Sequence, residues 1–280
     1  MTEYSVALEE QLQFARWFHD RPASMSTGHH KTLTAAVRQG GTYFWSRALN
    51  ELLLQCANTL PEWQLHPDML FTPHGFVRFQ EPIDAERLGI AGRGSLRSFL
   101  WACFSTGSDA GVSLTAHFAG DGDYFSTLDQ SSGPVVDLEW CWIPFGTGFE
   151  KALTSDAVDN RNAGIYARLF ASMMLLLSQR LLTTSHRAPD RAARRRIART
   201  DVALDSVVRV VELRRRESVS REGDSRDVEW ACRWWVSGHW RWQWRPKLAR
   251  HQWTWVRPYV KGPEDRPLRP PRTTIFAVVR

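Results

Sequence analysis

A change in hydrophobic period along the chain is the feature that most restricts its fold. Between Pro73 and Pro144, four segments alternate apolar and polar residues or form short apolar runs, and clusters of Gly, Pro, Asp or Ser separate them. This pattern predicts four antiparallel strands, in GFVRFQEPI, SLRSFLWACFS, GVSLTAHFA and PVVDLEWCWIPF. A sheet of this size needs other elements to cover its apolar residues.

Helical spacing of apolar residues flanks the strand region on both sides. A short amphipathic helix is predicted over residues 5–20 and a second over residues 43–60, each ending before a proline. The polar stretch SMSTGHHKT between them predicts a loop. Residues 162–182 are too continuously apolar for an exposed helix, so we predict a buried central helix there.

These elements predict an α+β fold in which helices pack on an antiparallel sheet over residues 1–184. The run HRAPDRAARRRIART is rich in arginine and nearly free of bulky apolar groups, so residues 185–200 are interpreted as a connector. Beyond it, SVVRVVELRRR and several later segments predict further strands. Residues 201–280 are therefore expected to form a basic, aromatic, mostly β module.

The net charge of +6 conceals an asymmetry between the two ends of the chain. Residues 180–280 hold 24 Lys+Arg and 11 Asp+Glu, and the preceding residues hold 12 and 19. A basic field of this kind raises the local concentration of polyanions. It is also consistent with an acidic protein partner or with anionic lipid.

Tryptophan and arginine are interleaved near the C-terminus. Eight of the 14 tryptophans fall between Trp230 and Trp255. On a strand, alternate residues share a face. One face would then look like core and the other like a charged platform. Nucleic acid fits this chemistry best, because guanidinium groups bind phosphates and unpaired bases stack on indoles. The alternatives are a structural aromatic core covered by arginines through cation–π contacts, and a protein-binding surface.

An arginine cluster adds to the basic field. If residues 191–199 are helical, Arg191, Arg195 and Arg199 lie on one side, and only solvent, carboxylates or phosphates can relieve their repulsion. A phosphate-binding arm and a solvated linker are both open interpretations. The residues expected to contact nucleic acid are Arg194, Arg195, Trp240, Arg241, Trp242, Arg245, Lys247, Arg257 and Lys261.

Two histidines in the basic module leave an enzymatic function open. A metal-independent ribonuclease needs a general acid, a general base and cationic groups that stabilise the phosphorane. His239 and His251 would be its catalytic residues. The alternative is that each histidine is a structural hydrogen-bonding group beside aromatic rings.

Metal, cofactor and membrane chemistry are not expected. The four cysteines, Cys56, Cys103, Cys141 and Cys232, are far apart and form no CxxC pair. No metal site or cofactor is therefore predicted. The polar N-terminal sequence and the interrupted apolar run from Leu169 predict neither a signal peptide nor a membrane span, so a cytoplasmic location is expected.

The C-terminal sequence resembles a module of uncharacterised proteins from actinobacteria, their plasmids and their phages. The shared pattern is GHWR, a turn, an apolar strand ending in proline, KGP and a final apolar strand. More distantly, Gly238–Arg241 and Lys261–Pro263 are similar to the end of the type V-A anti-CRISPR family that lowers the messenger RNA of its effector. The resemblance covers about the last 45 residues and implies a mobile-element setting of defence or counter-defence.

Taken together, these features predict an RNA-directed or ribosome-associated binding protein, with DNA as another possible ligand. A toxin-like ribonuclease and a protein-interaction or inhibitor module are the alternative functions.

Overall fold

The computed structural model describes residues 2–20, 27–90, 94–106, 109–119, 137–154, 161–179, 181–200, 204, 207–214 and 231–269. The chain forms two compact units, Met1–Arg214 and Arg215–Arg280. The elements of the first unit are α1 (Glu3–Asp20), α2 (Thr27–Gln39), β1 (Gly41–Trp45), η1 (Arg47–Leu49), α3 (Asn50–Thr59), η2 (Pro67–Met69), β2 (His74–Ile83), η3 (Glu86–Leu88), β3 (Ser95–Thr106), β4 (Asp109–Ala119), β5 (Asp137–Pro144), η4 (Phe149–Lys151), β6 (Leu153–Thr154), α4 (Arg161–Leu177), β7 (Leu182–Arg187), α5 (Arg191–Ala198) and β8 (Val208–Leu213).

The second unit contains β9 (Trp234–Val236), β10 (His239–Arg245), η5 (Pro246–Leu248), β11 (Arg250–Val256) and β12 (Tyr259–Lys261). It forms two small antiparallel sheets, β10–β11 and β9–β12. The C-terminal module is therefore β-structured in its described residues, as its alternation predicts.

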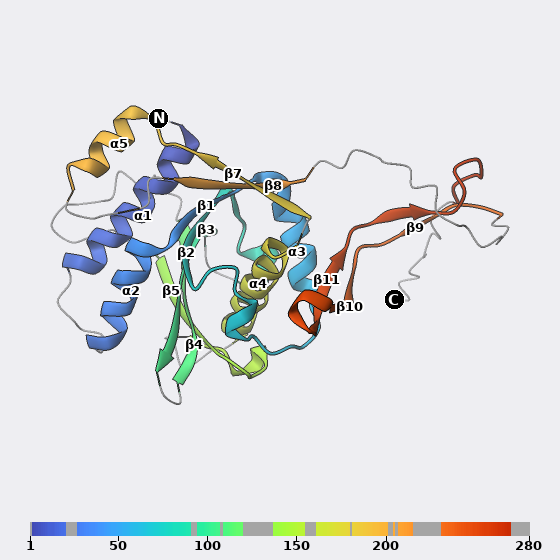
Figure 1. Ribbon diagram of the computed structural model, residues 1–280, viewed down its shortest axis with the longest axis horizontal. Coiled ribbons are helices and arrows are strands. Elements are labelled where there is room, and N and C mark those ends of the chain that lie inside the picture. The colour runs from blue at the N-terminus through green and yellow to red at the C-terminus, as the bar shows by residue number, and fades with distance from the viewer. Residues whose placement is uncertain are drawn as a thin grey trace, which may run out of the picture. The chain divides into compact units, whose positions relative to one another are not determined.

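The first unit is an α+β structure built on an eight-stranded sheet in the order β6-β5-β4-β3-β2-β1-β8-β7. Its strands β2 to β5 are antiparallel neighbours, which confirms the four predicted strands. The sheet as a whole is mixed, because β1 runs parallel to both β2 and β8. Figure 1 shows the sheet between two helical layers.

Helices cover both faces of this sheet. The helices α1 and α2 pack on one face, where Phe44, Phe76 and Leu100 belong to their hydrophobic core. The next residue on β3 after Leu100 is Trp101, which points to the other face of the sheet. Its ring centroid lies 5.9 Å from that of Phe170 on α4. Strands covered on both faces lose the simple apolar and polar alternation, because few positions can remain polar.

This double coverage explains one wrong prediction. The helix predicted over residues 43–60 begins as β1, and only its second half is helical, in α3. Residues 42–45 are all buried, so β1 has a continuous apolar run that periodicity does not distinguish from a buried helix. The helix predicted over 5–20 is confirmed by α1, and the one predicted over 162–182 is confirmed by α4 as far as Leu177, whereas Leu182 begins β7.

The loop predicted from SMSTGHHKT is also wrong for the part that the structure describes. Helix α2 begins at Thr27 and includes the end of that polar stretch. Among the residues of α2 whose side chains the structure describes, Leu33, Ala36 and Val37 are buried, with the spacing of one helical face. The end of the polar stretch thus belongs to the first turns of a helix.

The arginine-rich run is part of the first unit. Residues 185–200, interpreted from the sequence as a connector, contribute the end of β7 and all of α5. Strand β8, placed by the sequence in the C-terminal module, completes the sheet beside β1. Because β8 pairs with strands on both sides, it is held by two ladders of backbone hydrogen bonds.

A buried charged cluster joins α1 to the sheet. The Glu10 carboxylate forms an ion pair with Arg78 on β2, and its Oε1 lies 3.4 Å from Nδ1 of His117 on β4. The Ser98 hydroxyl lies 3.1 Å from the same His117 nitrogen. Burial opposes ionisation of Glu10, but the hydrogen bond from His117 and the charges of Arg78 and His117 outweigh it and lower the pKa of the carboxyl.

A second polar link ties α1 to the turn before β1. The Gln11 amide donates hydrogen bonds to the carbonyl oxygens of Val37 and Gly40, at 2.7 and 3.0 Å, and accepts one from the Thr42 hydroxyl. A side chain at Gly40 would meet the Gly75 backbone at 2.8 Å. The glycine therefore allows the end of α2 to approach β2 closely.

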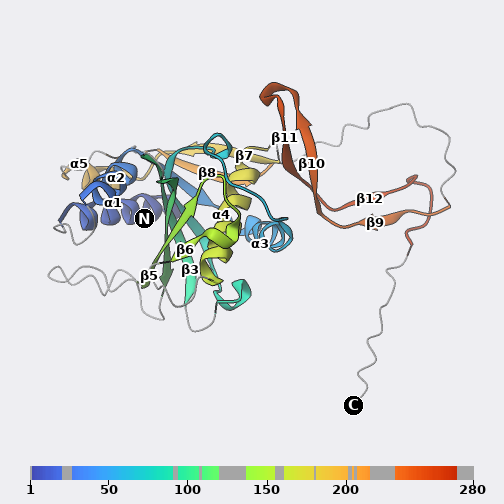
Figure 2. The ribbon, with the colours of Figure 1, turned by 90° about the horizontal axis from the view of Figure 1, so that it is seen from below.

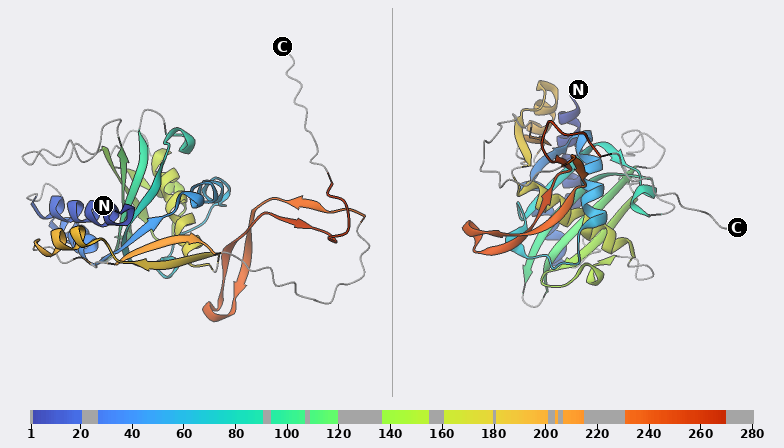
Figure 3. Two further views of the ribbon diagram at one scale, coloured as in Figure 1. Left: turned by 90° about the horizontal axis from the view of Figure 1, so that it is seen from above. Right: turned by 90° about the vertical axis from the view of Figure 1, so that its right-hand side faces the viewer.

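Asp190 connects the N-terminus of the chain to α5. Its carboxylate accepts hydrogen bonds from the backbone N–H of Ala193, from the Ser5 hydroxyl and from the Thr2 backbone N–H, at 2.9, 2.9 and 3.1 Å. These three donors, that of Ala193 first, lower the pKa of Asp190 to about 2. Asp190 is the N-cap of α5, and α1 and α5 lie side by side (Figures 1 and 3).

We expect Glu10→Gln to lower the free energy of unfolding by about 3–5 kcal/mol at neutral pH, because it leaves Arg78 without its buried anionic partner. The folded pKa of Glu10 lies below its ordinary value of 4.5. Its stabilisation is therefore complete above that value and is lost as the pH falls through the folded pKa. Urea denaturation of the wild type and of Glu10→Gln at several pH values should show that the difference between their free energies of unfolding becomes smaller in acid.

The control is Glu81→Gln, which removes a carboxylate that is 60% exposed. It should change stability by less than about 1 kcal/mol. If the difference in the free energy of unfolding between the wild type and Glu10→Gln stays constant from neutral to acidic pH, the stabilising role of the ionised Glu10 carboxylate is contradicted.

Candidate nucleic-acid interface

The second unit contains two ladders that follow one another along the same two chain segments. Strands β9 and β12 form the first, and β10 and β11 form the second and close through η5 (Figure 2). Ser237 and Gly238 interrupt one segment, and Arg257 and Pro258 interrupt the other. Equal numbers of residues on both sides keep the two ladders in register.

The register of β10 and β11 places six aromatic side chains on one face. Cross-strand partners share a face in an antiparallel pair, and here every partner on that face is aromatic. We call this set the aromatic row; its pairs are Trp240 with Trp255, Trp242 with Trp253, and Trp244 with His251.

The rings of the aromatic row contact one another within each pair, and His251 also links two neighbouring pairs. The centroids of Trp240 and Trp255 are 5.3 Å apart, and those of Trp242 and Trp253 are 4.9 Å apart. His251 contacts Trp244 edge-on at 5.1 Å and is stacked with Trp242 at 5.9 Å and 10°. Each such contact contributes about 0.5–1.5 kcal/mol, so the row holds its own rings in place.

Exposure rises along the row toward the hairpin tip. Trp255 is only 4% exposed, and it packs near Gly238 and Pro258 at the interruption. Trp242 and Trp244 are 47% and 49% exposed. The row is thus anchored at one end, and it presents indole surface at the other.

The opposite face of the hairpin carries the cations. Arg241, Arg245 and Arg250 alternate with the aromatic row, and Arg241 is exposed. The Arg245 guanidinium donates a 3.0 Å hydrogen bond to the Thr254 hydroxyl across the strands. The sequence prediction of an aromatic face and an arginine face therefore holds for β10.

Three further predicted residues lie beyond the two strands. Lys247 is exposed in η5 at the hairpin tip, which Ala249 closes in a left-handed conformation with φ of 47°. Arg257 lies at the interruption between the ladders. Lys261 lies on β12, with its ammonium 5.7 Å from the centre of the Trp234 ring.

Positive charge dominates the described part of this unit. Residues 231–269 contain nine Lys+Arg and two Asp+Glu, namely Glu264 and Asp265. Asp265 lies 3.6 Å from Arg266, outside the hairpin. The hairpin itself contains no acidic residue between its described ends, His239 and Val256.

The two histidines are not brought together. His239 begins β10 and lies on the arginine face, where it is paired with Val256 and its Nδ1 lies 3.0 Å from the Ser237 carbonyl oxygen. His251 lies on the aromatic face, opposite Trp244. His239 and His251 therefore lie on opposite faces of the β10–β11 hairpin and near its opposite ends, so they do not form an acid and base couple.

Arg194 and Arg195 lie on α5 in the first unit and are exposed.

The alternating segments on either side of Pro246–Ala249 are the signal that could have added Trp244 and Trp253 to the predicted binding residues. Two strands with tryptophan at every second position, joined by a short turn, predict a hairpin with cross-strand indole pairs.

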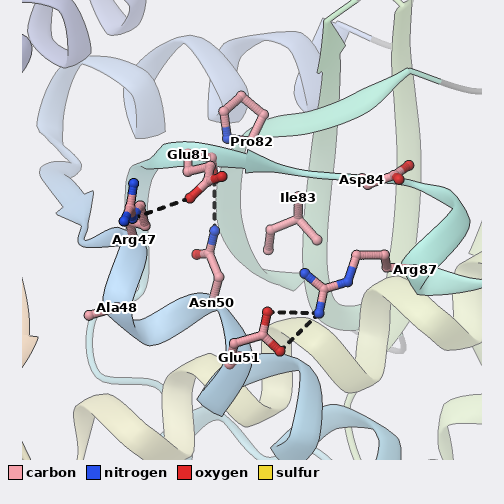
Figure 4. A pocket seen from close by; sticks show the side chains of 9 residues that line it. All are labelled: Arg47, Ala48, Asn50, Glu51, Glu81, Pro82, Ile83, Asp84 and Arg87. Carbon is pink, nitrogen blue, oxygen red and sulfur yellow. Dashed lines mark hydrogen bonds and ion pairs between the residues drawn. The ribbon is translucent and has the colours of Figure 1, made fainter.

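A hollow of about 640 Å³ in the first unit lies between η1, α3 and the end of β2 (Figure 4). Arg87 forms a bidentate pair with Glu51 at 2.8 and 2.9 Å, and Arg47 lies 3.6 Å from Glu81. Asn50 donates to the Glu81 carbonyl oxygen at 2.8 Å. The cations of this hollow are therefore matched by carboxylates on the same rim.

We expect Gly238→Ala to destabilise the anchored end of the aromatic row by about 1–3 kcal/mol, as overpacking does elsewhere. A Cβ there would lie 2.5 Å from Cζ2 of Trp255 and 3.1 Å from Cδ of Pro258. The near-ultraviolet circular dichroism of the tryptophans should weaken, and their thermal transition should move to lower temperature.

The control is Gly164→Ala in α4, where the nearest atom to the new Cβ is 3.8 Å away. This change should be neutral or stabilising, because alanine favours helix over glycine. An unchanged tryptophan spectrum in Gly238→Ala would contradict the packing described for Trp255.

None of the family models, curated proteins and solved structures compared with the chain matches it. Among the described residues, no helix has both the length and the apolar character that a bilayer crossing requires.

Proposed function

We propose that the second unit binds unpaired RNA, with bases stacking on the exposed end of the aromatic row and phosphates meeting the cations around it. The observation that carries this proposal is the half-exposure of Trp242 and Trp244 beside one another on the same face. Indoles offer a flat π surface that stacks with any base.

The row is suited to binding because its rings are already positioned. Trp242 contacts its partner Trp253 and also His251 from the neighbouring pair, and Trp244 contacts its own partner His251. Ring contacts of this kind restrict side-chain rotation before a ligand arrives. A preorganised surface loses less conformational entropy on binding than a mobile one.

The charge of the hairpin favours a polyanionic ligand. Arg241 and Lys247 are exposed, and the described hairpin has no carboxylate to neutralise them. The ribbon is a single layer. Stacked sheets lie about 10 Å apart, so each face of the ribbon extends about 5 Å from its midplane. This distance is shorter than the Debye length in physiological salt, which is about 8 Å. Cations on the arginine face therefore contribute to the potential felt on the aromatic face.

Single-stranded RNA fits better than a duplex. Bases in a duplex are covered by their neighbours, and the deep, narrow major groove of A-form RNA excludes a two-stranded ribbon. Unpaired loops and ends are the usual sites of base recognition in RNA, and their bases are free to stack on aromatic side chains. The aromatic row supplies such a platform through the exposed indoles of Trp242 and Trp244.

We expect the double variant Trp242→Ala/Trp244→Ala to bind labelled single-stranded RNA at least about 30-fold more weakly, since each of the two stacked bases contributes about 1–3 kcal/mol. Fluorescence anisotropy measures the affinity, and quenching of tryptophan emission by RNA should be reduced in parallel. The matched control is Trp235→Ala. Trp235 is 61% exposed on β9 and lies outside the aromatic row.

Two comparisons between nucleic acids define the ligand. A duplex of the same sequence should bind more weakly than the single strand, and single-stranded DNA of that sequence tests whether RNA is preferred. Equal loss of affinity in Trp235→Ala, or wild-type affinity in the double variant, would refute stacking on the row. Retention of a protein partner from nuclease-treated lysate, with no RNA affinity, would favour a protein-interaction module instead.

A further inference from the structure

Helix α5 in the first unit presents a row of arginines away from its packed side. Ala193 and Ile197 are buried, four residues apart, and Ile197 belongs to the core beneath α1. Arg191, Arg195 and Arg199 are exposed and repeat at the same four-residue interval on the opposite side. Arg194 is also exposed, between the two sides.

The nearby carboxylates of Glu9 and Asp190 have partners other than the outward arginines. Glu9 on α1 accepts a 2.8 Å hydrogen bond from Nε of Arg196. Asp190 is occupied by Ala193, Ser5 and Thr2 at the N-cap. Among the described residues, no carboxylate forms an ion pair with the outward arginines; Asp201 and Asp205 lie outside those residues.

The position of these charges works against the local stability of the helix. Arginines four residues apart repel one another. Arg191 also lies in the first turn, where the helix dipole disfavours a cation. A helix that needs only to cover a core could carry neutral residues at these three positions. A polyanionic ligand would relieve the repulsion.

We propose that the outward face of α5 is a second phosphate-binding site, which holds the backbone of the same RNA whose unpaired bases stack on the aromatic row. This inference rests on the proposed function. The three arginines span about 12 Å at 1.5 Å per residue, a length that corresponds to three or four nucleotides of a stacked strand. No aromatic residue lies on α5, so the site reads charge without base identity.

Two sites in one chain strengthen binding to any RNA long enough to reach both. Once the aromatic row holds one segment, α5 meets the rest of that RNA at a high effective concentration. An RNA that covers only the row gains nothing from α5. Dependence on RNA length therefore separates the α5 site from the aromatic row.

The test uses the full chain and the double variant Arg191→Gln/Arg195→Gln. With an unstructured RNA of about 30 nucleotides, we expect affinity to fall about tenfold or more. The slope of log K against log salt should become shallower by about 1.4, which corresponds to two phosphate contacts on a single strand. With an RNA of about four nucleotides, both quantities should stay at their wild-type values.

The control is Arg47→Gln/Arg87→Gln, which removes the same charge from arginines already paired with Glu81 and Glu51. It should leave the salt slope unchanged, and thermal unfolding verifies that both double variants are folded. A long RNA that binds the α5 variant with wild-type affinity and slope would overturn the α5 site and leave the aromatic row standing. Loss of slope in the control as well would also overturn it, because only net charge would then matter.

Discussion

The second unit depends on one constraint: a two-stranded ribbon has a single layer and cannot enclose its own aromatic face. Within the hairpin, the six rings of the aromatic row stabilise one another by cross-strand contact instead. Mutual contact leaves an outer surface on the rings near the tip, where Trp242 and Trp244 are about half exposed. The same contacts that hold the hairpin together thus prepare its surface for a flat ligand.

The first unit solves a different problem, which is how to attach α1 to a sheet that carries polar residues on that face. Arg78, Ser98 and His117 project from three adjacent strands, and Glu10 provides the matching acceptor. An ion cluster of this kind contributes little net stability compared with apolar packing, but it disfavours misplacement, because a shifted helix would leave charges buried without partners. Its geometry therefore helps to fix where α1, and with it α5, lies on the first unit.

Much of the fold could be predicted from the sequence where turn residues bound short apolar or alternating segments, or where apolar residues repeat at the helical period. The alternation in β2 to β5 and the helical period of α1 gave the correct elements, and parity placed Arg241 and Trp242 on opposite faces. Buried strand β1 was mistaken for helix because both of its faces are apolar. The pairing of β8 with β1 depends on contacts more than 160 residues apart, which local pattern does not encode. The partners of the aromatic row likewise required the register of the hairpin.

Asp190 makes the start of the chain and its arginine helix interdependent. The hydroxyl of Ser5 meets a carboxylate 185 residues further along the sequence, and that carboxylate caps the first turn of α5. The orientation of the guanidinium groups is thus governed partly by a serine that bears no charge and lies in another helix. Substitution at Ser5 would therefore loosen the first turn of the arginine helix, although the two lie far apart in the sequence.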